Sequence, residues 1–180
     1  AWWTTSTSMV ATGQKAPDFI RPAVVGGDTQ MLELFAAVRE HSAVALVFEP
    51  ADFVPTGTAE LRAVREAGWH DHPELLVVAV TGDSLYSHFA YAAQYDLGFP
   101  LVSDFHGGVA DSYDLLVAEW EGHSEIPGRA TVVVDGDWTV RTVERVDPLD
   151  SRSPAPVERA TGSLRGLGLD VTRPDVEYDL

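Results

Sequence analysis

Short apolar runs alternate with amphipathic stretches along the chain. Two continuous, valine-rich runs, at 43–48 and 75–80, are typical of strands that are covered on both faces. Apolar residues recur at helical spacing in three further stretches, at 32–40, 59–67 and 85–95. The alternation predicts strands that are connected by helices, and hence a parallel or mixed sheet.

The rest of the chain adds strands at one side of that sheet. Gly136 and Asp137 predict a tight turn between two extended runs, which makes the second run a hairpin partner of the first. The other predicted elements are extended stretches at 16–25, 99–102, 131–134 and 138–146, helices near 109–116 and at 157–167, and a Pro/Ser-rich linker at 148–156. Together they predict an α/β domain of three layers with a central mixed sheet.

The composition limits the chemistry more than the fold. The 180 residues are 45% hydrophobic, which fits one folded domain with its own core. None of them is cysteine. This absence excludes a disulfide framework, a zinc finger, a thiolate-bound iron–sulfur cluster and a cysteine nucleophile within this chain.

The net charge of the chain indicates the salt concentration of the environment in which it works. Twelve basic against 28 acidic side chains give a net charge of −16, and Lys15 is the only lysine. Such a surface stays hydrated where salt screens its self-repulsion, so we expect the cytoplasm of a halophile; an acidic mesophilic protein is the alternative. The charge also argues against nucleic acid and anionic membranes as partners, because both are polyanions.

The first residues show no export or membrane signal. Residues 1–10 contain neither a basic region nor a long apolar run, and no stretch approaches the ~20 apolar residues of a membrane span. Trp2 and Trp3 stand out in this polar leader. They fit a flexible tail, or alternatively an aromatic anchor that docks on a partner subunit.

Several segments in consistent order resemble the peroxiredoxins of the AhpC/TSA type. The segments are QKAPDF at 14–19, AVALVFEPADFVPTGTAEL at 43–61, TGDSLYSHFAYAAQYDLGFPLVSD at 81–104, residues 105–113, and RATVVVD at 129–135. The resemblance covers 14–147, leaving a leader at 1–13 and a C-terminal linker, short helix and acidic tail at 148–180. It implies a thioredoxin-like α/β/α fold and association as a homodimer or a larger homo-oligomer.

The chain departs from the family pattern at the reactive positions. The resemblance places Pro50 on the family's proline and Arg129 on its active-site arginine, but Val54 on its threonine or serine and Gly57 on its peroxidatic cysteine. A peroxidase of this type needs a thiolate to attack the peroxide oxygen. We therefore expect no thiol peroxidase activity and no catalytic residues, only vestigial positions.

The remaining groups suggest an anion site. Gly57 and Thr58 would lie at a helix start, where free backbone N–H groups and Arg129 could bind a carboxylate, sulfate or phosphate. The alternative is that Arg129 pairs with Glu60, a structural residue one turn later, and that the pocket is vestigial. No metal or cofactor is expected.

Three further motifs have simpler explanations. The His-Asp-His motif at 70–72 has the spacing of a small metal site but no evident third ligand, so a solvated loop is favoured. His88 behind Asp83 and Ser84 suggests a Ser/His/Asp arrangement, yet helix capping and packing explain these residues better. The segment at 106–108 reads as a turn.

Two hypotheses follow. The first is a catalytically inactive peroxiredoxin-like protein that acts as a binding or structural subunit. The alternative is an antioxidant thiol peroxidase or oxidoreductase of the redoxin family, whose cysteine was mutated in this chain or is supplied by a partner.

Overall fold

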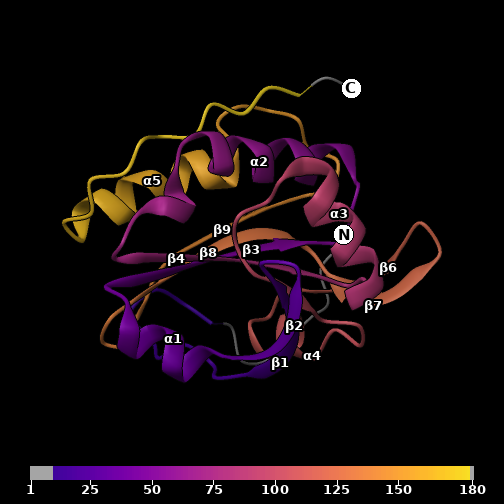
Figure 1. The fold of residues 1–180 in the computed structure, drawn as a ribbon, viewed down its shortest axis with the longest axis horizontal. Helices are drawn as coiled ribbons and strands as arrows, with labels where there is room; N and C mark the ends of the chain where they lie inside the picture. Colours follow the sequence, from indigo (N-terminus) through magenta and orange to yellow (C-terminus); the bar gives the residue numbers. More distant parts are fainter. Residues whose placement is uncertain (1–9, 179–180) are drawn as a thin grey trace.

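A mixed sheet of seven strands forms the centre of the molecule, with helices on both faces (Figure 1). The computed structural model describes residues 10–178. The strands are β1 (Ile20–Val25), β2 (Asp28–Glu33), β3 (Ala43–Glu49), β4 (Leu75–Thr81), β5 (Leu101–Ser103), β6 (Leu116–Trp120), β7 (His123–Pro127), β8 (Arg129–Asp135) and β9 (Val140–Val146). The helices are α1 (Leu34–Glu40), α2 (Pro55–Glu66), α3 (Leu85–Tyr95), α4 (Gly108–Ser112) and α5 (Pro156–Gly166), with a short 3₁₀ turn, η1, at Trp69–Asp71.

The sheet has the order β2-β1-β5-β4-β3-β8-β9. Strand β3 lies between β4, to which it is parallel, and β8, to which it is antiparallel. All residues of β3 and β8 are buried, which explains the continuous apolar run at 43–48 and the three consecutive valines at 132–134. The antiparallel β8–β9 pair confirms the predicted hairpin after Gly136.

Alternate residues of the central strands face two separate cores. Ala45 and Val47 of β3 face α2, α3 and α5, whereas Val44, Leu46 and Phe48 face α1 and α4. Because both faces of the sheet are covered by helices, the structure has the predicted three-layer α/β/α arrangement.

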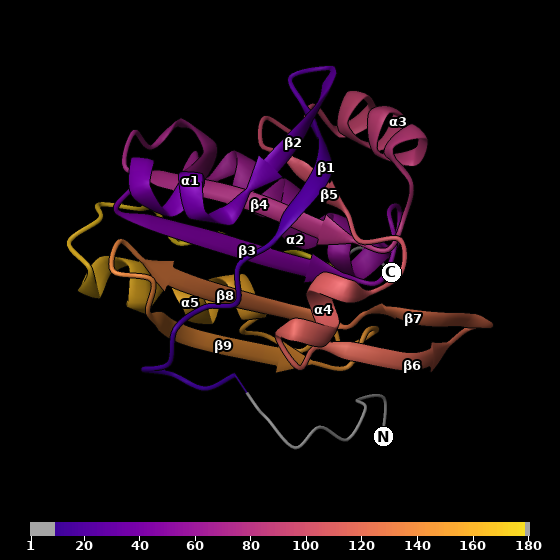
Figure 2. The same cartoon turned by 90° about the horizontal axis from the view of Figure 1, so that it is seen from below.

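One predicted helix is wrong in detail, and one hairpin is missing from the prediction. The helix expected near 109–116 ends at Ser112, and Leu116 begins β6 instead. Strands β6 and β7 form a separate two-stranded hairpin that extends beyond the main sheet (Figure 2). Its apolar cluster is small, namely Val117, Trp120 and Ile126, and the charged residues between them hide any strand period in the sequence.

Helix α2 starts earlier than predicted. It begins at Pro55 rather than at residue 59, because a proline at the first helical position needs no hydrogen-bonded N–H and already has a helical φ. This start brings Gly57 and Thr58 into the first turn of the helix, as the resemblance implied.

The C-terminal segment is packed against the domain. Val157, Ala160 and Leu164 of α5 are fully buried on the α2 side of the sheet. Beyond α5, Val171 and Val176 are buried in the same core, and the Trp69 indole N–H donates to the Thr172 carbonyl over 2.7 Å. The segment from residue 155 to residue 178 therefore packs on the same core as the rest of the domain.

The structure bears differently on the two tryptophans near the N-terminus and on the predicted absence of a membrane span. Trp2 and Trp3 lie outside the described residues. Within residues 10–178, no helix has both the length and the apolar character that crossing a membrane requires.

Removing a core side chain from α5 should destabilise the whole domain. We expect Leu164→Ala, at a fully buried position, to lower the free energy of unfolding by about 2–5 kcal/mol through lost packing and a cavity. Gly162→Ala in the same helix is the matched control, because its added methyl meets no atom within 4 Å. It should raise stability by up to about 1 kcal/mol. Chemical denaturation measures both; an unchanged Leu164→Ala midpoint would show that α5 unfolds separately.

Candidate functional site

The predicted site residues meet where β3 ends and β8 begins, below the first turns of α2. The antiparallel register pairs Phe48 with Ala130, so that Glu49 and Arg129 follow on neighbouring strands. By the two-residue alternation of β3, Glu49 faces α2 as Ala45 and Val47 do. The sheet thus carries an acid and an arginine beneath the helix that contains Gly57.

Arg129 is fully engaged by its own chain. Its Nε donates to Glu60 Oε2 over 2.7 Å, and both side chains are 1% exposed. Its other two nitrogens donate to the Asp150 carbonyl and to the Tyr178 hydroxyl. Burial raises the pKa of Tyr178 to about 12, so this phenol remains a neutral acceptor. Each of the three guanidinium nitrogens thus has a partner within the chain, and the buried side chain offers little surface to an external anion.

Glu49 occupies the space beside Gly57. A Cβ built on Gly57 would lie 2.4 Å from Glu49 Oε2 and 2.7 Å from its Cδ, well inside the contact distance of real Cβ atoms. Glu49 is 1% exposed. Any side chain at position 57, a cysteine included, therefore requires the Glu49 carboxyl to move. The position of the Glu49 carboxyl is thus compatible with a glycine at position 57 and not with a larger residue there.

The surroundings of the Glu49 carboxyl raise its pKa and so favour the protonated form. Burial, followed by the charge of Glu60, raises its pKa well above the ordinary value, while Arg129 partly lowers it. Neither oxygen receives a hydrogen bond from a described residue. A proton on Glu49 accounts for this, because the neutral acid can donate to the Glu60 carboxylate, and that hydrogen bond also raises the pKa. With one proton shared by the two acids, the charges of Glu49, Glu60 and Arg129 sum to zero.

The other vestigial positions serve packing. Val54 packs against Val117, Trp120 and Ile126 of the β6–β7 hairpin and so extends a small apolar core where the family has a hydroxyl. Pro50 remains at the end of β3, and its carbonyl accepts from the Gly82 N–H over 3.2 Å.

The groups of the anion site that was expected at Gly57, Thr58 and Arg129 have partners within the chain. Thr58 Oγ1 is hydrogen-bonded to the Tyr91 hydroxyl at 2.9 Å, and Gly57 is buried against Glu49. The structure instead contains the Arg129–Glu60 pair of the alternative interpretation. The physical reason is that two carboxylic side chains of the chain itself already occupy the space around the guanidinium.

A second buried cluster contains His88. Its Nδ1 lies 2.7 Å from Asp52 Oδ2 and its Nε2 lies 3.0 Å from the Val102 carbonyl. Thr81 and Ser87 donate hydroxyl hydrogen bonds to the same carboxylate. Because the imidazole is 0% exposed and each of its nitrogens already has a hydrogen-bond partner, it fixes the loop before α2 to α3 and β5.

The residues near His88 have separate roles. Ser84 caps α3 by accepting from the Ser87 N–H at 3.3 Å, as predicted. Asp83 accepts from the Asp52 N–H at 2.7 Å. The sequence offered no signal for Asp52, which lies 36 residues before His88 in an irregular loop.

The remaining motifs also have local partners. His72 Nδ1 accepts from the Glu74 N–H at 3.1 Å, and His70 packs so closely on Gly98 that a Cβ there would lie 2.7 Å from the imidazole. Gly107, with φ of 69°, lets the turn approach the Glu125 carbonyl. The described part of the chain contains no group of three or more His, Asp or Glu residues arranged to hold a metal ion.

Comparisons with known proteins show similarity to peroxiredoxins in both sequence and fold. The profile of the AhpC/TSA family matches residues 12–143. Alkyl hydroperoxide reductase E of Mycobacterium tuberculosis is 29% identical over 147 residues, which are 80% of this chain and 91% of that protein. Peroxiredoxin Q of Sedum lineare chloroplasts is 34% identical over 105 residues, 56% of this chain and 53% of that protein. Among solved structures, Mycobacterium tuberculosis AhpC superposes with a TM-score of 0.73 at 20% identity, covering 91% of this chain and 96% of its own.

Replacing Glu49 by its neutral isostere should remove part of the pH dependence of stability. A raised pKa means that the folded state holds its proton more tightly, so stability falls as pH rises above 4.5, the ordinary value, toward the raised one. One such group contributes a slope of at most about 1.4 kcal/mol per pH unit. We expect Glu49→Gln to lack this contribution to the pH dependence of the unfolding free energy. Urea unfolding between pH 5 and 8 measures it, provided that the slope is determined to within roughly 0.7 kcal/mol per pH unit.

Glu33→Gln, an exposed glutamate on β2, is the control for this titration and should retain the slope of the unmodified protein. If Glu49→Gln also retains it, Glu49 is ionised in the folded state and the protonated form is excluded.

Removing the buried cation should cost far more than removing an exposed one. Arg129→Met leaves Glu60 buried without its partner, and we expect a loss of about 3–5 kcal/mol in unfolding free energy. Arg141→Met breaks the 3.2 Å pair with Asp135, but the Arg141 side chain is 47% exposed, and a loss of about 1 kcal/mol or less is expected. Equal losses in the two variants would contradict a structural role for the buried pair.

Proposed function

This chain belongs to the AhpC/TSA family of peroxiredoxins, and we propose that it is a member without thiol peroxidase activity that acts by binding, as a subunit of a homo-oligomer or of a protein complex. The observation that carries this proposal is the contact between Gly57 and Glu49. The position that the family resemblance assigns to the nucleophile has no side chain, and a carboxyl fills the space next to it.

The chemistry of the site supports the loss of activity. Peroxide reduction needs a group that gives an electron pair to the peroxide oxygen and is itself oxidised, as a thiolate is. A carboxylic acid cannot be oxidised in this way, and the chain of 180 residues contains no cysteine. Arg129, which would stabilise a thiolate, is paired with Glu60 and is 1% exposed.

The alternative, a peroxidase whose thiol was mutated or comes from a partner, is less well supported. Replacement of a cysteine alone would leave the surrounding pocket open, whereas here Glu49 fills it and Val54 is packed into the β6–β7 hairpin. A partner thiol would have to reach Gly57, which is buried in the first turn of α2. The enclosed geometry favours a site adapted to the absence of the thiol.

Peroxide consumption with dithiothreitol as reductant tests the proposal. We expect the unmodified chain to consume hydrogen peroxide no faster than the heat-denatured protein. Gly57→Cys should remain inactive or become less stable, because its Cβ overlaps Glu49. The double variant Glu49→Ala/Gly57→Cys makes room for the sulfur and is the informative comparison, with Glu49→Ala as its cysteine-free control. Turnover by the unmodified chain would overturn the proposal.

A further inference from the structure

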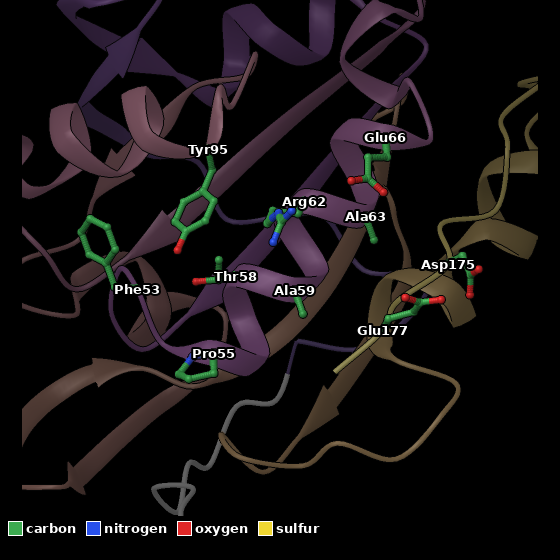
Figure 3. A pocket seen from close by; sticks show the side chains of 10 residues that line it. All are labelled: Phe53, Pro55, Thr58, Ala59, Arg62, Ala63, Glu66, Tyr95, Asp175 and Glu177. Carbon is green, nitrogen blue, oxygen red and sulfur yellow. The ribbon is translucent and has the colours of Figure 1, made fainter. Parts of the chain in front are cut away.

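A pocket of about 420 Å³ lies on the outer face of α2. Figure 3 shows Phe53 and Tyr95 on one side of it, Asp175 and Glu177 on the other, and Arg62 between them. The residues of α2 that face the pocket are different from Gly57 and Glu60, which face the sheet. The pocket therefore lies on another face of α2 than Gly57, although Thr58 of the candidate site also lines it.

One wall of the pocket is aromatic and is held in place. The centre of the Phe53 ring lies 4.8 Å from the centre of the Tyr91 ring, and the centres of the Tyr91 and Tyr95 rings are 5.5 Å apart. Phe53 has a φ of 65° and is 41% exposed. Left-handed backbone is rare for a bulky residue, and here it presents the ring at the rim of the pocket instead of in the core. Tyr91 is buried and fixed by Thr58.

The opposite wall is acidic and is formed by the C-terminal segment. Residues 174–178 alternate between buried and exposed, so that Val176 enters the core while Asp175 and Glu177 face the pocket. The segment is held by the Val176 N–H, which donates to Glu158 over 3.4 Å, and by the hydrogen bond from Arg129 to Tyr178. The arginine thus positions the acidic wall.

The charges of the pocket favour a cation. Glu66, Asp175 and Glu177 outnumber Arg62, the single basic residue that lines it. The Arg62 guanidinium lies 5.6 Å from the centre of the Tyr95 ring, so the chain's own cation covers that ring and the Phe53 ring is the aromatic surface left for a ligand. The net charge of −16 on the chain also attracts cations toward the surface.

We propose that this pocket binds a small organic ammonium cation with an apolar body. The body would lie on Phe53 and the small side chains of α2, and the ammonium group would face Asp175 and Glu177. A volume of about 420 Å³ fits a ligand of this size. The inference does not rest on the loss of peroxidase activity, because it concerns the outer face of α2.

Calorimetric titration with benzyltrimethylammonium at fixed ionic strength tests this site. We expect saturable binding by the full chain and roughly tenfold weaker binding after Asp175→Asn/Glu177→Gln. Asp28→Asn/Glu33→Gln on β2 removes the same charge from exposed positions outside the pocket, and should change the affinity less than about twofold. Phe53→Leu should weaken binding about threefold or more by removing the aromatic face.

Benzyl alcohol and benzoate, which share the ring but not the cation, should bind at least about tenfold more weakly. Three results would overturn the proposal: benzoate binding as tightly as the ammonium, equal losses in the two charge variants, or binding of oligolysine but not of benzyltrimethylammonium. None of them bears on peroxide consumption, so the two proposals fail independently.

Discussion

The buried guanidinium of Arg129 connects three parts of the chain that are distant in sequence. It bonds to Glu60 on α2, to the backbone at Asp150 and to Tyr178 near the C-terminus. A charge that is almost fully buried is tolerated only when it is paired and hydrogen-bonded. The need to satisfy this one cation therefore fixes how α2 and the C-terminal segment lie on the sheet. In this chain the arginine stabilises the packing of these segments, and its ion pair with Glu60 compensates for the burial of its charge.

Glu49 adds a second constraint to the same cluster. Two carboxylates beside one arginine leave one negative charge without a partner, and protonation of Glu49 removes it. The neutral carboxyl then needs space, and only a glycine at position 57 leaves it. Glycine at the expected nucleophile position is thus explained by packing as well as by the loss of a thiol. The same arginine holds Tyr178, and through it the acidic wall of the pocket on the outer face of α2.

The sequence predicted the parts of the structure that depend on local periodicity. The valine-rich strands and helix α3 follow directly from apolar spacing, and α3 has the bounds that were expected. The β6–β7 hairpin was missed because its small core has few apolar residues among many charged ones. Glu49 was missed as well, although a glutamate in register with Ala45 and Val47 on a buried strand is a detectable signal.

Contacts over long sequence separations were beyond prediction. Tyr178 is 49 residues from Arg129, and Asp52 is 36 residues from His88. Neither pair belongs to a motif with fixed spacing, so only the three-dimensional arrangement brings them together. The Arg129–Glu60 pair was predictable as an alternative because the family resemblance placed Arg129 near Gly57, and Glu60 lies one helical turn after Gly57.

Infrared difference spectroscopy at neutral pH tests the central claim most directly, by comparing the unmodified protein with Glu49→Gln. A protonated carboxyl has a carbonyl band that an ionised carboxylate lacks. If Glu49 is the neutral acid beside Gly57, the band of a buried, protonated carboxyl will be present in the unmodified protein and absent in the variant. Identical spectra in the carbonyl region, with a carboxylate band lost in the variant, would show that Glu49 is ionised and would contradict this account of the site.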